Sequence, residues 1–134
     1  MRAKRLKIGI ISKQEYINRT VAIAKGEYKP KKDEPKVWFE SIKSMAQILS
    51  NENQELLKLI VKHKPSSITE LERISHRKKA NLSRTLKTLE KYNIVDLLKT
   101  SQGTIAPKVR ATDFEVQFGL HYSHIGEAKP QSAF

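Results

Sequence analysis

The chain has 134 residues, and its 26 Lys and Arg against 14 Asp and Glu give a formal net charge of +12. A chain of this length folds as one domain with short appendages and buries about two-thirds of the surface that its unfolded form exposes. Hydrophobic residues make up 38% of it, which excludes wholesale disorder. The absence of cysteine excludes a disulfide framework and a thiolate nucleophile. The longest apolar runs fall far short of the roughly 20 residues that cross a bilayer. We therefore expect a cytoplasmic protein without membrane contact.

The surplus of positive charge lies before residue 100. Residues 1–49 carry 12 basic and 5 acidic side chains, residues 50–99 carry 11 and 6, and residues 100–134 carry 3 and 3. A nucleic-acid-binding protein needs such a surplus, because each Lys or Arg that meets a phosphate releases condensed counterions. An excess of basic residues also occurs on ordinary solvated surfaces. The arrangement of these residues must therefore distinguish a nucleic-acid-binding surface from a solvated one.

Residues 1–40 predict an N-terminal arm. Apolar residues alternate over residues 5–11, which predicts a short strand. Ser12 can then cap an amphipathic helix over residues 13–25, and Gly26 is suited to end that helix.

The next segments predict a linker followed by two helices. Residues 28–36 contain two prolines and no apolar periodicity, so we expect an extended, solvated linker. Trp38, the only tryptophan, is expected in the core. Ser41 can cap a first helix, which Ser50-Asn51 breaks and recaps. A second helix starts at Asn51 or Asn53 and ends before Pro65. We expect these two helices to pack on each other.

A short helix, a turn and a longer helix are predicted next. Thr69 is the expected N-cap of a helix of about two turns, and a tight turn over residues 75–78 leads to a helix over residues 79–92. Three leucines of that longer helix form a single inward-facing stripe: Leu82, Leu86 and Leu89.

The opposite face of this longer helix carries Arg, Asn, Ser and Lys side chains and no carboxylate. Arginine can donate two hydrogen bonds to guanine, and asparagine can pair with adenine. The residues expected to read DNA bases are Asn81, Ser83 and Arg84. The residues expected to contact the DNA backbone are Thr69, Arg73, Lys78, Lys79, Lys87 and Lys99.

A β-hairpin is predicted after the longer helix. Asn93 is suited to a left-handed helix end, and strands over residues 94–99 and 104–109 flank a turn at residues 100–103. The candidate contacts of this hairpin, or wing, are Ser101, Gln102, Thr104 and Lys108. The sequence thus predicts a mainly α protein with a small hairpin (α+β), in which residues 41–110 form a winged helix-turn-helix.

The stretch from Thr69-Glu70-Leu71 through NLSRTLKTLEK at residues 81–91 resembles the winged helix of small MarR-type prokaryotic regulators. RTVAIAKGE at residues 19–27, KVWF at residues 36–39 and the helix at residues 41–49 are similar to a group of predicted transcriptional regulators of bacteria and archaea. That group includes suspected antitoxins. The resemblance covers about residues 14–120 and implies DNA binding through a winged helix.

Residues 111–120 predict a C-terminal strand, because apolar side chains alternate from Phe114 to Leu120. Its partner could be the first strand, the wing or a second protomer. We expect a homodimer formed by the N-terminal helix and this strand, since two-fold dimers place recognition helices about 34 Å apart. Residues 121–134 are expected to form a mobile tail. His121 and His124 lack further ligands nearby, so no metal is expected.

Together these features predict a sequence-specific regulator that binds double-stranded DNA at the nucleoid and represses its own operon. The sequence contains no glycine-rich phosphate loop and no nucleophile elbow, so we expect neither an enzyme nor a cofactor. Two alternatives stay open. One is an antitoxin whose residues 1–40 or tail cover a toxin, which is compatible with DNA binding. The other is a non-specific nucleoid or RNA binder.

Overall fold

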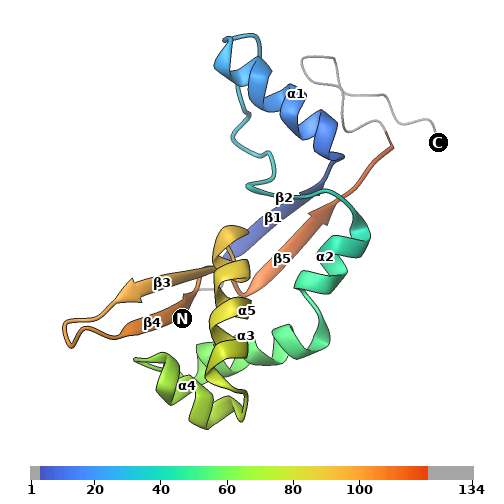
Figure 1. The fold of residues 1–134 in the computed structure, drawn as a ribbon. Helices are drawn as coiled ribbons and strands as arrows, with labels where there is room; N and C mark the ends of the chain where they lie inside the picture. The colour runs from blue at the N-terminus through green and yellow to red at the C-terminus, as the bar shows by residue number, and fades with distance from the viewer. Residues whose placement is uncertain (1–3, 121–134) are drawn as a thin grey trace.

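The computed structural model describes residues 4–120, which form an α+β fold (Figure 1). Within these residues lie five helices, a three-stranded parallel sheet and a two-stranded antiparallel hairpin. No helix in this part of the chain is both long and apolar enough to cross a membrane. The expectations for the tail, His121 and His124 lie outside the described residues.

The parallel sheet joins the two ends of the described chain. It consists of β1 (Arg5–Ile10), β2 (Val37–Phe39) and β5 (Asp113–Gln117), in the order β2-β1-β5. Ile8 of β1 lies beside Val37 on one side and Val116 on the other. The C-terminal strand therefore pairs with the first strand of its own chain, which was one of the three partners considered. It ends at Gln117, three residues earlier than expected.

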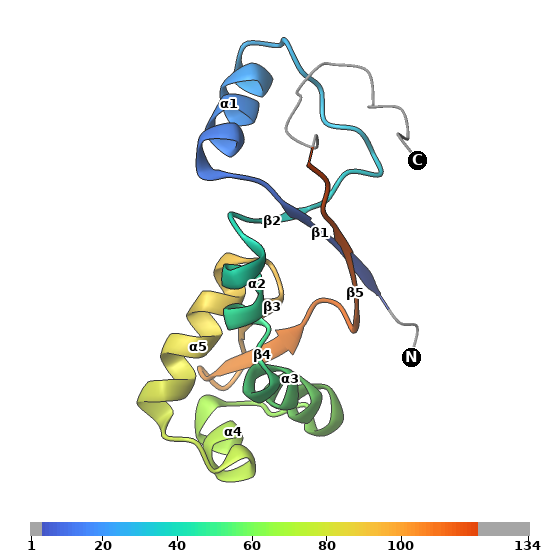
Figure 2. The ribbon, with the colours of Figure 1, turned by 90° about the vertical axis from the view of Figure 1, so that its right-hand side faces the viewer.

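Helix α1 (Lys13–Ala24) connects β1 to β2, as parallel strands require a crossover between them. The hydroxyl oxygen of Ser12 accepts a hydrogen bond from the Glu15 backbone N–H at 3.2 Å, which confirms the predicted cap. Gly26 has a φ of 76°, as expected for a residue that ends a helix. Figure 2 shows the sheet between α1 and the group of helices α3 to α5.

Residues 28–36, the segment before β2, are less solvated than predicted, because Arg19 of α1 forms an ion pair with Glu34 of this segment. The Arg19 guanidinium lies 2.7 Å from the Glu34 carboxylate, and the two side chains are 13% and 14% exposed. The same guanidinium lies 5.0 Å from the centre of the Trp38 ring. Trp38 itself is half-buried, so its predicted place in the core is wrong. Alternation along β2 sends its neighbour Phe39 inward instead.

Helix α2 (Ile42–Ile48) is capped by Ser41, as predicted. Helix α3 (Asn51–His63) starts at the first of the two predicted positions, and Ser50 is its cap. They do not pack extensively on each other as expected, and the main contact of α2 is with β2. The chain turns between the two helices, and the Asn53 side-chain amide donates to the Ile48 carbonyl at 2.9 Å across that turn.

The predicted short helix, longer helix and hairpin are α4 (Ile68–Ser75), α5 (Lys79–Lys91) and the strands β3 (Val95–Lys99) and β4 (Ile105–Val109). The predicted cap Thr69 is wrong: Ser67 caps α4 by accepting from the Glu70 N–H at 3.0 Å. Ser67 directly precedes Ile68, the first helical residue, so its hydroxyl can reach the N–H groups of the first turn, whereas Thr69 already lies inside the helix. Asn93 is left-handed with a φ of 61°, as predicted.

One core runs through both halves of the molecule. All three leucines of the predicted stripe on α5 are fully buried in it. The inward side chains of the sheet belong to the same core, and the ring of Phe39 stacks on that of Tyr92 with centroids 4.4 Å apart. The arm and the helices α3 to α5 are therefore packed together, which holds α5 in a fixed orientation relative to the sheet.

Candidate nucleic-acid interface

A short connection, residues 76–78, joins helices α4 and α5. His76 follows α4 in the left-handed conformation, with a φ of 61°. Lys78 precedes α5 but offers no side-chain cap. The Glu72 carboxylate takes over that role, because it accepts a hydrogen bond from the Lys79 backbone N–H at 3.1 Å. The first helix thereby fixes the start of the second.

The outer face of α5 is polar and accessible, as the sequence predicted. Asn81, Arg84 and Lys87 are exposed, and Ser83 is half-buried. Burial of the three leucines against the core determines which way these side chains point, because a helix that buries one stripe presents the opposite one to solvent.

The predicted basic contacts on α4, on α5 with the residue before it, and on the hairpin take part in no salt bridge within residues 4–120. We call the following exposed residues the cationic surface: Arg73, Lys78, Lys79, Arg84, Lys87, Lys99 and Lys108. The salt bridges found within residues 4–120 involve none of them. Their charge is thus available to an anionic partner.

Two of the predicted backbone contacts meet where α4 and α5 adjoin. The Lys79 ammonium lies 3.4 Å from the hydroxyl oxygen of Thr69, and both residues are exposed. Arg73 is exposed on the same short helix as Thr69. The junction therefore offers ammonium, guanidinium and hydroxyl donors, which are groups that commonly bind phosphate.

The hairpin tip presents Ser101 and Gln102 to solvent. Thr104 differs from the other hairpin candidates, because its hydroxyl is engaged within the protein. It donates to the Ser66 carbonyl at 2.7 Å and lies 2.7 Å from the Thr100 hydroxyl. The hydrogen bond from Thr104 thus connects the hairpin to the segment before α4.

Sequence reasoning missed a hollow beside the start of α5. It has a volume of about 720 Å³, and its walls include Asn53 of α3, Arg77 of the turn, and Asn81 and Arg84 of α5. The Arg77 guanidinium donates to the Glu52 carbonyl, which joins the turn to the first turn of α3. No local pattern marks this hollow, because it forms only when α3 and α5 come together.

One carboxylate near the start of α4 is held in its charged form. The Ser66 backbone N–H and hydroxyl donate to the same Glu70 oxygen at 3.1 and 3.0 Å. These two hydrogen bonds, with a smaller contribution from the nearby positive charges of Arg73 and His63, keep the pKa of Glu70 below its ordinary value. Its negative charge lies in the first turn of α4, where the helix dipole favours it.

The fold and this surface define a small α+β protein that presents one basic helix face beside a β-hairpin. The chain belongs to the HVO_A0114 family, which it matches over residues 48–116, just over half of its length. The match runs from the end of α2 through the hairpin into β5. Searches of curated proteins and of solved structures found no match.

Proposed function

We propose that this protein is a sequence-specific regulator of transcription that binds double-stranded DNA through a winged helix-turn-helix. Helices α3, α4 and α5 would form the helical part and β3–β4 the wing. In this arrangement α5 enters the major groove, whose width admits one helix, and the wing lies against the adjacent backbone.

The outer face of α5 carries the proposal. It combines exposed Arg and Asn side chains, which suit base edges, with exposed lysines that have no carboxylate partner within the described residues. Buried leucines on the opposite side keep this face outward. A local excess of positive charge attracts a polyanion such as DNA.

The test is a selection of bound duplexes from a random pool, followed by affinity measurements on the selected and scrambled sequences. We expect the selected duplex to bind at least about a thousandfold more tightly than the scrambled one. Equal affinity for both would favour the non-specific nucleoid or RNA binder, and no binding to either would end the proposal.

We also propose that the protein acts as a homodimer through α1 and β5. Helix α1 has no buried residue, and its apolar side chains Tyr16, Ile17 and Val21 are each 43–44% exposed. Strand β5 is an edge of the sheet and has no neighbour on its outer side within residues 4–120. An open edge and an uncovered apolar helix both favour association with another chain.

Light scattering coupled to gel filtration tests this assembly. We expect the wild-type chain to have twice the mass of one chain and Val21→Lys to be monomeric, because a charge in an apolar interface is costly. Gln102→Lys is the control, since Gln102 is exposed in the turn of the hairpin and belongs to neither α1 nor β5. A wild-type monomer that forms a stable complex with a co-expressed toxin through α1 would support the antitoxin alternative instead.

A further inference from the structure

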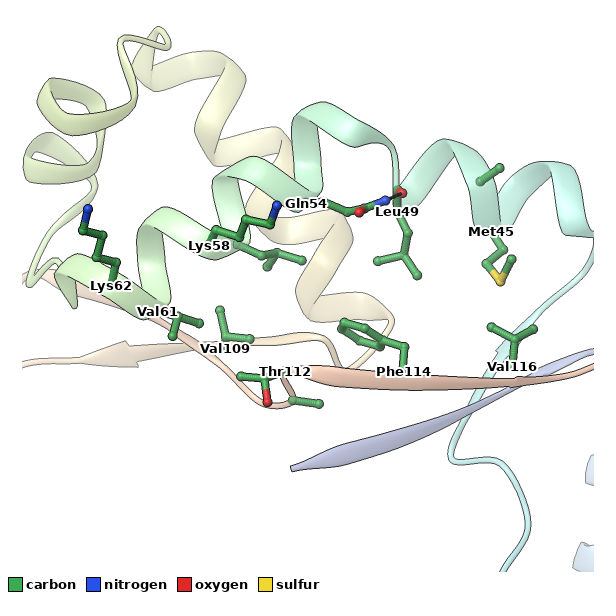
Figure 3. Close-up of a pocket in the computed structure, with 13 residues that line it drawn as sticks. Met45, Leu49, Gln54, Lys58, Val61, Lys62, Val109, Thr112, Phe114 and Val116 are labelled. Carbon is green, nitrogen blue, oxygen red and sulfur yellow. Dashed lines mark hydrogen bonds between the residues drawn. The ribbon is translucent and has the colours of Figure 1, made fainter. Parts of the chain in front are cut away.

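A groove separate from the cationic surface lies between α3 and the parallel sheet (Figure 3). Its volume is about 720 Å³, which is within the usual range of small-molecule sites. None of the residues assigned above to DNA contact lines it. It is therefore a feature that DNA binding does not explain.

The walls of the groove are mainly apolar. Leu57 of α3 is a buried lining residue. The half-buried side chains of Leu49 and Phe114 face each other across the groove. Val116 at one end remains 46% exposed. Nothing within residues 4–120 covers this strip, so water contacts apolar surface that a ligand could bury.

The charge along the rim has one sign. Lys58 and Lys62 lie one helical turn apart on α3, and no Asp or Glu lines the groove. Lys58 has a partner in Glu55, with an N–O distance of 3.1 Å, but both side chains are about 70% exposed, so this pair is easily exchanged. Lys62 takes part in none of the salt bridges of the described chain.

The groove is elongated and differs at its two ends. Figure 3 shows Lys62 at one end, and Met45 and Val116 at the other. The β5 side alone runs from Thr112 to Val116, four residues or about 13 Å of extended chain. Its shape suits a narrow molecule with one charged end.

We propose that this groove binds an amphipathic carboxylate, a molecule with one acid group and an unbranched apolar chain of medium length. The apolar chain of the ligand lies along Leu57 and Phe114, and its carboxylate forms ion pairs with the ammonium groups of Lys58 and Lys62. A neutral apolar molecule would give Lys62 no carboxylate partner, and a cationic one would be repelled by both ammonium groups. This inference holds whether or not the protein binds DNA.

Calorimetric titration of the full chain with decanoate, decanol and decyltrimethylammonium tests the proposal. We expect decanoate to bind at one site per chain, decanol to bind about three- to thirtyfold more weakly because two exposed ion pairs are lost, and the cation not to bind. Equal binding of decanoate and decanol, or binding of the cation, would overturn the assignment of a carboxylate. If decanoate does not bind, the proposal that this groove is a ligand-binding site is wrong.

Two variants locate the ligand, and circular dichroism confirms that each is folded. The double variant Lys58→Gln/Lys62→Gln should weaken decanoate binding three- to thirtyfold and leave decanol binding unchanged, about the difference between the two ligands. Ala46→Phe adds a ring to the groove wall at an exposed position and should abolish binding of both. Lys43→Gln, an exposed cation outside the groove, should change neither.

A second copy of the chain is the competing occupant of this groove. If the wild-type protein is a dimer that Ala46→Phe dissociates, the groove is a subunit interface and the ligand proposal fails. If Ala46→Phe removes decanoate binding without changing the mass in solution, the ligand proposal stands.

Discussion

Replacement of Arg84 and Lys87, one at a time, separates base reading from phosphate attraction on α5. Both side chains are exposed on the outer face of the helix, and neither forms a salt bridge within the described residues. Truncation to alanine should leave the core intact, because Leu86 and its neighbours on the stripe are untouched and alanine is the best helix former. Changes in DNA affinity can therefore be attributed to the lost side chains.

The two substitutions should change DNA binding in different ways. A guanidinium that donates two hydrogen bonds to guanine contributes about 1–3 kcal/mol of discrimination, so Arg84→Ala should weaken binding to the selected duplex roughly 5- to 150-fold. Its affinity for a scrambled duplex should change much less. Lys87→Ala should weaken binding to both duplexes alike, because phosphates carry no sequence information.

The salt dependence of DNA affinity gives an independent estimate of the number of phosphate contacts. The cations assigned to the DNA backbone are Arg73, Lys78, Lys79, Lys87 and Lys99. If each of them meets one phosphate, the logarithm of affinity should fall with the logarithm of salt with a slope of about −4.5 for each bound chain, or about −9 for the proposed homodimer. Lys87→Ala should reduce the size of that slope by about 0.9 for each bound chain.

Fluorescence anisotropy of labelled duplexes over a salt series measures all of these quantities. Lys29→Ala is the control, because Lys29 is an exposed cation of the linker before β2. It should leave sequence preference and slope at the wild-type values. If Arg84→Ala keeps the full preference for the selected duplex and Lys87→Ala keeps the wild-type slope, the placement of α5 in the groove is refuted.

Three further substitutions test the fold that supports this surface. Gly9→Ala would place a Cβ 2.5 Å from the Trp38 ring, so urea denaturation should show a loss of about 1–3 kcal/mol, and an unchanged midpoint would contradict that packing. Glu70→Gln removes a carboxylate whose pKa is lowered by hydrogen bonds from Ser66. A carboxylate of this kind stabilises the fold at any pH above its pKa in the unfolded chain. That stabilisation is lost as the pH falls through the pKa of the same group in the folded protein. Its melting temperature should therefore lie below that of wild type at about pH 7 and converge with it in acid; a gap that persists in acid would count against the charge. Thr104→Val loses the hydrogen bond to the Ser66 carbonyl and should cost about 0.5–1.5 kcal/mol, with faster amide exchange in the hairpin; wild-type exchange rates there would mean that this bond does not hold the hairpin.

Local signals predicted the elements that form the cationic surface. The leucine stripe of α5 has the helical period over seven residues, and burial of all three side chains confirmed the inferred orientation. Gly26 and Asn93 were predicted to end helices, and both have the positive φ that suits this position. These features depend on residues close together in sequence, which is why they could be predicted.

Long-range pairing could not be predicted. Strand β5 lies beside β1 although more than 100 residues separate them, and alternation in β5 was equally compatible with two other partners. Trp38 was placed in the core because it is large and apolar, but strand alternation sent it to the other face, where Gly9 leaves room for the ring. The groove beside Phe114 and the hollow beside Arg77 likewise exist only in the assembled fold.

Amide chemical-shift mapping with the selected duplex tests the central claim most directly, because it reports which residues meet DNA. The account predicts that the largest changes fall on residues 79–91, with smaller ones at Thr69, Arg73 and the hairpin tip, and that α1 and β5 change little. If the duplex leaves residues 79–91 unaffected, or shifts only α1 and the sheet, α5 is not the element that this protein uses to recognise DNA.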